Sequence, residues 1–269
     1  MFEKFIAGDG VLRSQAFIEE EVEHNLIHMI GSVDHSMKVK TADDQLIFAQ
    51  TSGYNPWLWI SRELETDLQK QRIESLLDFI GDRSFPGVSA APNTANLFAE
   101  SYCTRKGRLY HNQMTLIAYY CPSLILPAVV EGKLLQANKE HSGIVAEFMA
   151  GFSEDAFGMP AAPDTFLSMA QEAVRSGQMY LWVVEEIPVS MAKIAHISTR
   201  HGRINDVFTP RVHRKKGYAS AVVAEICQML LDQKITPMLY ADAKNPDSNK
   251  VYQSIGFVEA GRIAEIRFA

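Results

Sequence analysis

The chain has 269 residues, of which 47% are hydrophobic and 22% are charged, a composition typical of a globular protein and not of a disordered one. Its 26 Lys and Arg residues against 32 Asp and Glu residues give a formal net charge of -6, which disfavours binding to nucleic acid or to an anionic membrane. No apolar run approaches the roughly 18 residues of a membrane span, and the start resembles no secretion signal. The three cysteines form no CxxC pair, so we expect a reduced, cytoplasmic protein without a disulfide framework or zinc site.

Apolar periodicity predicts three helices in the first half of the chain, and Glu19, Glu20, Glu23 and His24 fall on the solvent side of the first. The helices are expected at Ser14–Ile30, Glu63–Ile80 and Thr94–Thr104. Strands are expected at Gln45–Gln50, Trp57–Ser61 and Leu109–Tyr120. Pro122 and Pro127 then mark the best candidate boundary, which predicts domains of residues 1–126 and 127–269.

The second half alternates helices and strands more clearly, with a turn predicted near Glu186–Pro188 between two strands. Its helices are expected at His141–Phe152, Pro163–Ser176, Tyr218–Asp232 and Ser248–Ser254. Its strands are expected at Lys133–Asn138, Met179–Glu185, Val189–Thr199, Arg203–Thr209, Met238–Asp242 and Gly261–Phe268. This order predicts an α/β fold with a mixed central sheet, and a divergent duplication of the two halves is possible.

The most informative stretch is a cationic loop between a predicted strand and a strongly periodic helix. Residues 200–216 contain six Arg or Lys residues and one acid, Asp206. Gly217 and Ala219 at the helix start would let an anion approach the first backbone amides, and Ser220 could add a hydroxyl. A bland interpretation is equally open at this point: solvated cations in a loop, with Gly217 making a turn.

A second segment follows the strand at Met238–Asp242. Ser248 suits a helix N-cap and Gly256 a C-terminal cap, so a short helix is predicted between them. Asn249 and Tyr252 are three residues apart and therefore lie on one face of that helix. An amide and a phenol on one face could hydrogen-bond an extended ligand and supply a proton.

Together the two segments resemble the signature of the GNAT superfamily of N-acetyltransferases. Arg214, Gly217 and Ala219 match its Q/R-x-x-G-x-G/A motif at a strand-to-helix junction. About thirty residues on, the stretch from Asn245 to Phe257 is similar to the second motif of the family. The resemblance covers about half the chain, residues 133–268. It implies a GNAT fold with a mixed, mostly antiparallel sheet, the first half being a degenerate GNAT-like domain.

The resemblance also implies acetyl-CoA as co-substrate, no metal, and a role for each matching position. The backbone of the strand end would meet the pantetheine arm and thioester, and the loop amides would hold the pyrophosphate. The implied cofactor-binding residues are Val207, Phe208, Thr209, Arg214, Lys215, Lys216, Gly217, Tyr218, Ala219, Ser220, Asn245 and Asn249. Tyr252 would protonate the departing CoA thiolate; alternatively it is a half-buried packing residue. In the first half, the nearest counterpart of the loop, Gly87–Pro92, has no cation.

The general base is not fixed by the sequence. Asp206, Glu147, Glu154 and His196 are candidates, and for each an ordinary structural role is the competing interpretation. The resemblance implies a primary amine of a small molecule or a peptide as acceptor. The sequence does not fix which one, because acceptor pockets carry no short motif. Two alternatives to an N-acetyltransferase remain: a non-catalytic CoA-binding or sensor module, and an interaction protein on the same scaffold.

Overall fold

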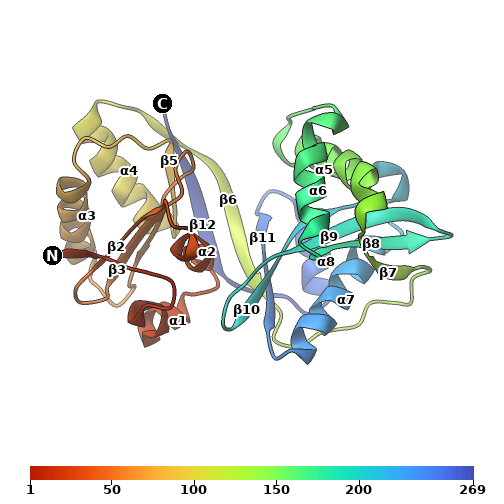
Figure 1. Ribbon diagram of the computed structural model, residues 1–269. Helices are drawn as coiled ribbons and strands as arrows, with labels where there is room; N and C mark the ends of the chain where they lie inside the picture. The colour runs from red at the N-terminus through yellow and green to blue at the C-terminus, as the bar shows by residue number, and fades with distance from the viewer. The chain divides into compact units, whose positions relative to one another are not determined.

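The structure, a computed structural model, describes residues 1–269, which form two compact units (Figure 1). Unit 1 contains residues 1–119, 240–245 and 259–269, and unit 2 contains residues 120–239 and 246–258. The predicted α/β class with a mixed, mostly antiparallel sheet is confirmed. The boundary between residues 126 and 127 stays a prediction, and most of the last strand is counted in unit 1. No helix is long and apolar enough to cross a bilayer.

Unit 1 contains a sheet that is mostly antiparallel. Among its first six strands in sheet order, one neighbouring pair is parallel. In sheet order the strands are β1 (Phe2–Lys4), β2 (Met37–Thr41), β3 (Leu46–Gln50), β4 (Trp57–Ile60), β5 (Gly87–Ala90), β12 (Val258–Phe268) and β6 (Tyr110–Tyr120). Strands β4 and β5 run parallel, with Trp57 opposite Ser89 and Leu58 opposite Ala90. The other pairs from β1 to β12 are antiparallel.

Alternation along the strands of unit 1 supplies a core on each face of its sheet. Leu46 and Phe48 of β3 pack with helices α3 (Thr66–Ile80) and α4 (Pro92–Lys106). Ile47 and Ala49 point to the opposite face and join a second core formed with the N-terminal segments. Those segments are η1 (Gly10–Arg13), α1 (Gln15–Glu19) and α2 (Leu26–Ser32).

The long first helix predicted over Ser14–Ile30 is wrong, because residues 20–25 form turns between α1 and α2. Glu20, Glu23 and His24, expected on its solvent side, are instead 6%, 1% and 1% exposed. The turns fold these side chains inward, where Arg62 pairs with both carboxylates. The apolar periodicity of residues 14–30 could not reveal this turn, because the turn is stabilised by Arg62, which lies about 40 residues away in the sequence.

Unit 2 has the sheet order β11 (Thr236–Asp242, of which residues 236–239 belong to this unit), β10 (His201–Phe208), β9 (Ile187–Ile197), β8 (Met179–Val184) and β7 (Lys133–Gln136). Helices α5 (Ser142–Phe157) and α6 (Leu167–Arg175) share a core with β8, β9 and Phe208. Figure 1 shows α7 (Tyr218–Asp232) and α8 (Pro246–Ser254) on the other face. The β8–β9 turn is made by Glu185 and Glu186, both with positive φ, as a tight hairpin turn requires.

A parallel pair of strands joined by a crossover helix occurs once in each unit. In unit 2, β10 and β11 run parallel and α7 connects them. In unit 1, β4 and β5 run parallel and α3 connects them. The two units thus repeat one topology, and the segment of unit 1 that corresponds to the loop before α7 is 61–65, before α3. The counterpart predicted at Gly87–Pro92 is wrong, because those residues form β5 and the start of α4.

Candidate active site

The start of α7 offers backbone amides to an anion. The first intrahelical bond at this end runs from the Ala221 amide to the Gly217 carbonyl, at 3.0 Å. The amides of Tyr218, Ala219 and Ser220 therefore have no acceptor within the helix. Gly217 has φ of +84° and Lys215 has φ of +62°. Left-handed residues of this kind turn successive amides into an anion-binding concavity, and the helix dipole adds to the attraction.

The strand leading into this loop parts from its parallel neighbour. The pairing of β10 with β11 runs from His201–Thr236 to Arg203–Met238, whereas β10 continues to Phe208. On the other side, the register of β10 against β9 shifts between Asn205 and Phe208, where Asp206 has φ of +52°. This is the geometry of a β-bulge, which bends a strand and re-aims its backbone groups. Residues 204–208 thus supply a strand edge beside which an extended ligand could lie.

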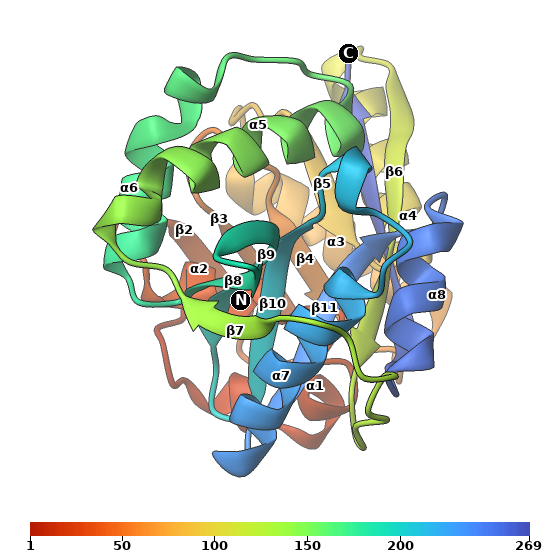
Figure 2. The same cartoon turned by 90° about the vertical axis from the view of Figure 1, so that its right-hand side faces the viewer.

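Most cations of the loop already have carboxylate partners, which the sequence did not indicate. Arg211 bonds Asp155 of α5 at 2.7 Å, and Arg214 contacts the other oxygen of the same carboxylate. The Arg214 Nε also donates to the Thr209 carbonyl at 2.9 Å. Lys215 bonds Asp247 at 2.7 Å. Figure 2 shows the short helix that contains Arg211 beside the C-terminal end of α5. The consecutive cations 214–216 are all exposed, and Lys216 is the one among them for which no carboxylate partner is found.

Helix α8 contacts α7 and carries the predicted donor pair. Tyr252 is 7% exposed, and its ring meets Phe257 edge-on with 5.9 Å between centroids. Burial raises the pKa of the Tyr252 phenol well above its usual range, so the phenol keeps its proton at neutral pH. Asn249, one turn earlier, is half-buried. The packing role weighed from the sequence is therefore present, and the acid role stays a prediction.

An open hollow of about 380 Å³ lies at the end of β10. It is lined by Glu147, Phe148, Gly151, Glu154, Asp155, Phe208, Pro210 and Arg211. A Cβ atom at Gly151 would lie only 2.5 Å from the Phe208 ring, so the glycine lets this ring pack directly on α5. The hollow thus adjoins Phe208, one of the strand-end residues that the resemblance assigns to cofactor binding.

The candidate bases are now separated by position. Glu147 and Glu154 both line the hollow and are exposed. Asp206 lies in the bulge, and burial raises the pKa of its carboxyl, an effect that Lys193 and Arg203 oppose. His196 pairs with Arg203, roughly 16 Å along the strand from Phe208 at ~3.3 Å per residue. Glu147 and Glu154 are consequently the best placed for a substrate in the hollow.

The predicted cofactor residues fall mainly on one connected part of unit 2. Val207, Phe208, Thr209 and residues 214–220 follow one another from β10 to α7, and Lys215 ties them to α8. The Phe208 and Thr209 carbonyls already accept bonds from Ser190 and Arg214. Asn245 lies in the preceding turn, where its amide bonds the Asp242 carbonyl. Sequence reasoning missed Asp155, whose separation of about 60 residues from the loop left no local signal.

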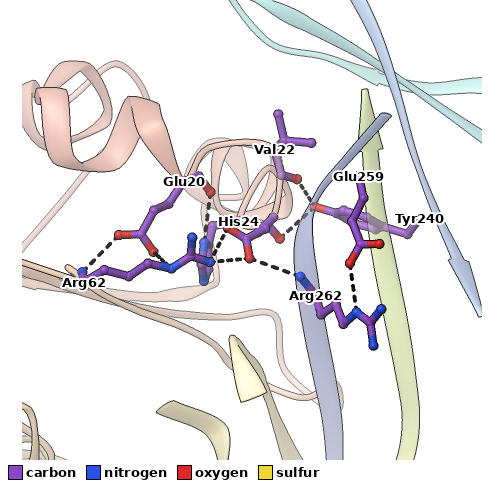
Figure 3. Close-up of polar contacts among 8 residues, drawn as sticks. Glu20, Val22, His24, Arg62, Tyr240, Glu259 and Arg262 are labelled. Atoms are coloured by element: carbon purple, nitrogen blue, oxygen red, sulfur yellow. Dashed lines mark hydrogen bonds and ion pairs between the residues drawn. The ribbon is translucent and has the colours of Figure 1, made fainter. Parts of the chain in front are cut away.

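In unit 1 the corresponding loop, residues 61–65, is held by ion pairs between its Arg62 and two buried carboxylates, Glu20 and Glu23 (Figure 3). Glu20 accepts the Arg62 amide at 3.0 Å and its Nε at 3.2 Å. Both Glu23 oxygens contact the Arg62 guanidinium, and Glu23 also accepts the Arg262 amide at 3.1 Å. A Cβ at Gly261 would lie 1.9 Å from the Glu23 carboxylate, so only glycine permits this approach.

The same region of unit 1 disfavours a second phosphate site. Acids surround the start of α3, at Glu63, Glu65 and Asp67, and an anion there would be repelled. The only nearby cation of the loop, Arg62, is held by Glu20 and Glu23. Together with His24, these carboxylates offer metal-ligand atoms within 4.8 Å of one another, but the Arg62 guanidinium already occupies their oxygens.

This cluster predicts opposite behaviour of two glutamine variants. Burial raises the pKa of both Glu20 and Glu23, and it lowers the pKa of His24 to about 4, so His24 adds no positive charge at pH 7. The cluster therefore holds two carboxylates but only one positive charge, that of Arg62. We expect Glu23→Gln to lower the free energy of unfolding by about 2 kcal/mol, because it breaks the two-oxygen pair. Glu20→Gln leaves that pair intact and removes the excess charge.

The pH dependence of Glu20→Gln follows from the raised carboxyl pKa. The stability that a protonated Glu20 contributes is present below its unfolded pKa of ~4.3 and is lost as pH rises through the folded pKa. The free energy of unfolding of Glu20→Gln, minus that of the unsubstituted chain, should therefore rise as the pH increases from 4.5 to 7.5. Urea unfolding at both pH values measures this. Equal losses in the two variants at pH 7.5 would contradict the assignment.

Comparisons with known proteins agree with this fold. The family model described as FR47-like protein matches residues 175–266, about a third of the chain, which include β10, the loop, α7 and α8. A GNAT-family acetyltransferase structure from Colwellia psychrerythraea has 10% identity and a TM-score of 0.58, over 100% of this chain and 98% of that one. A GCN5-related N-acetyltransferase from Sphaerobacter thermophilus has 15% identity and a TM-score of 0.62, over 100% and 95%. No curated protein sequence matches significantly.

The chain has the GNAT fold, and its residues 175–266 match the FR47-like family model. The resemblance inferred from the two motifs is thereby confirmed. A further similar structure, a GCN5-related N-acetyltransferase from Kribbella flavida, has 14% identity and a TM-score of 0.54, over 94% of this chain and 96% of that one. Such likenesses extend through both halves of the chain. They show the fold, and these three similar structures are described as acetyltransferases.

Proposed function

We propose that the chain is an acetyl-CoA-dependent N-acetyltransferase that transfers acetyl directly to a primary amine in a ternary complex. One observation carries the proposal: β10 parts from β11 and leads, within one loop, to the exposed first amides of α7. A single extended donor could then bond the strand edge with its pantetheine arm and the helix start with its pyrophosphate. Its thioester would reach the hollow beside Phe208.

The reaction has the following balance. The cationic acceptor amine first loses a proton to Glu147 or Glu154, directly or through water, and the neutral amine then attacks the thioester carbonyl. The tetrahedral intermediate expels the CoA thiolate, which takes a proton from the Tyr252 phenol, and the nitrogen of the new amide gives its remaining extra proton to the phenolate. Holding both reactants in one site supplies much of the rate, because the attack becomes effectively unimolecular. The hollow is open and bordered by carboxylates, which favours a cationic amine such as a small-molecule amine or a peptide amine.

The non-catalytic alternatives make a different prediction. A CoA-binding sensor would bind acetyl-CoA without releasing CoA when amines are added, and an interaction protein would not bind it. The three buried free cysteines fit a reducing cytoplasm, and the proposal includes neither a nucleic-acid nor a membrane partner. A thiol-release assay over a panel of polyamines, amino acids, aminoglycosides and lysine peptides separates these functions. We expect amine-dependent CoA release with at least one class; saturable binding without release would favour the sensor.

A further inference from the structure

A segment without helix or strand, residues 121–132 between β6 and β7, crosses unit 2 and is called the strap. Its Cys121 amide bonds the Pro237 carbonyl at 2.8 Å, and its Ile125 amide bonds the Ile255 carbonyl at 3.0 Å. At its other end, Trp182 Nε1 donates to the Glu131 carbonyl at 2.9 Å. The strap therefore follows a defined path from the end of α8 to β8.

Along this path the strap lies directly against both helix-terminal glycines of the candidate site. A Cβ at Gly256, after α8, would be 2.2 Å from the Ser123 carbonyl oxygen. A Cβ at Gly217, before α7, would be 2.9 Å from Val130 Cγ2. In Figure 2 the strap, in yellow-green, runs from beside α8 across the first part of α7 to β7. Val130, the residue after Val129, is consequently a neighbour of Gly217, the residue directly before α7.

The middle of the strap presents apolar side chains to solvent. Ile125 is 57% exposed, Leu126 is 74% exposed and Val129 is fully exposed. A single exposed apolar residue needs no explanation, but three within five positions, next to the cationic loop, form a small apolar surface beside an anion site. The exposed Lys216 precedes Gly217 at the edge of the same loop. An apolar ring attached to a phosphate would meet both features at once.

We propose that Leu126 and Val129 of the strap form a wall against which the nucleoside end of the acyl donor packs. The proposal rests on the proposed function, since it takes the donor pyrophosphate to lie at the start of α7. The adenosine is joined directly to that pyrophosphate, and a purine face is flat and apolar enough to be stabilised by aliphatic side chains. The strap would then select donors that carry a nucleotide over shorter pantetheine thioesters.

The test combines a strap variant with a shortened donor. The double variant Leu126→Ser with Val129→Ser removes the apolar wall and leaves the anchoring bonds, which are made by other residues. S-acetyl-4′-phosphopantetheine keeps the thioester, the arm and one phosphate but lacks the nucleoside. Ile187→Ser, at an exposed apolar residue of the β8–β9 hairpin, is the matched control. Dissociation constants come from calorimetry on the full chain, and thermal unfolding checks that each variant is folded.

We expect the double variant to bind acetyl-CoA about five- to tenfold more weakly, the scale of some 40–60 Å² of lost apolar contact. Its affinity for S-acetyl-4′-phosphopantetheine should be unchanged, and Ile187→Ser should bind both donors normally. Unchanged acetyl-CoA affinity in the folded double variant, or equal weakening of both donors, would overturn the strap assignment while leaving the proposed function in place. If the unsubstituted chain bound neither donor, both would fall.

Discussion

A Ser220→Asp variant should lose acetyl-CoA affinity by tenfold or more, while its fold is kept. Ser220 is the third residue of α7, within the first turn whose amides lack helical acceptors. A carboxylate there interacts favourably with the helix dipole, by about 0.3–1 kcal/mol, so the helix itself is not weakened. It stands, however, where the pyrophosphate is proposed to bind, and like charges ~5 Å apart near a surface repel by about 3 kcal/mol.

The matched control for this variant is Ser220→Asn, which has nearly the same shape as Asp and no charge. Calorimetry with acetyl-CoA should give a near-normal dissociation constant for Ser220→Asn and a strongly raised one for Ser220→Asp. Substitution of Gly217 would be a poorer test, because its φ of +84° and its contact with Val130 would strain any side chain. Equal affinities of the Asp and Asn variants would rule out an anion at the start of α7.

Tyr252→Phe should lower turnover by ~10²-fold or more and leave acetyl-CoA affinity nearly normal, the usual scale for a positioned general acid. The substitution keeps the ring that packs against Phe257 and deletes only the hydroxyl. Because burial raises the phenol pKa, Tyr252 should remain protonated across the working range. The rate should therefore show no fall caused by its ionisation below pH ~10.

Tyr252→Phe has to be measured under conditions in which the chemical step limits the rate, because a slow product release would hide the loss of a proton donor. Single-turnover measurement of acetyl transfer, with enzyme in excess over acetyl-CoA, reports the chemical step directly. Near-normal single-turnover rates would assign Tyr252 to packing alone. A parallel loss of binding would instead show that the hydroxyl helps to hold the donor.

Strongly periodic elements could be predicted from the sequence, and those that depend on distant partners could not. Helix α7 was predicted with its observed bounds, Tyr218–Asp232, because its apolar stripe and Gly217 are local signals. Strand β2 was missed because Lys38 and Lys40 interrupt its apolar pattern. Both are buried: Lys38 bonds the Gly31 carbonyl at 2.9 Å, and Lys40 pairs with Glu3, Asp9 and Asp44.

The candidate site shows the same division. The loop and α8 could be found because each carries a short motif, whereas the hollow is assembled from α5 and the end of β10. The charge of the loop was overestimated, since Asp155 and Asp247 come from other elements and pair with three of its cations. The strap has no motif, and its role depends on where it crosses the helix-terminal glycines.

The central claim is that one acetyl-CoA binds per chain, at the start of α7, and calorimetric titration of the full chain with acetyl-CoA tests it most directly. The account predicts a single class of sites with a stoichiometry of one, because the corresponding loop of unit 1 is acidic and its Arg62 is paired internally. It also predicts weaker binding at high salt, which screens the attraction between the pyrophosphate and the exposed helix start. Two molecules bound per chain, or no binding at all, would contradict it.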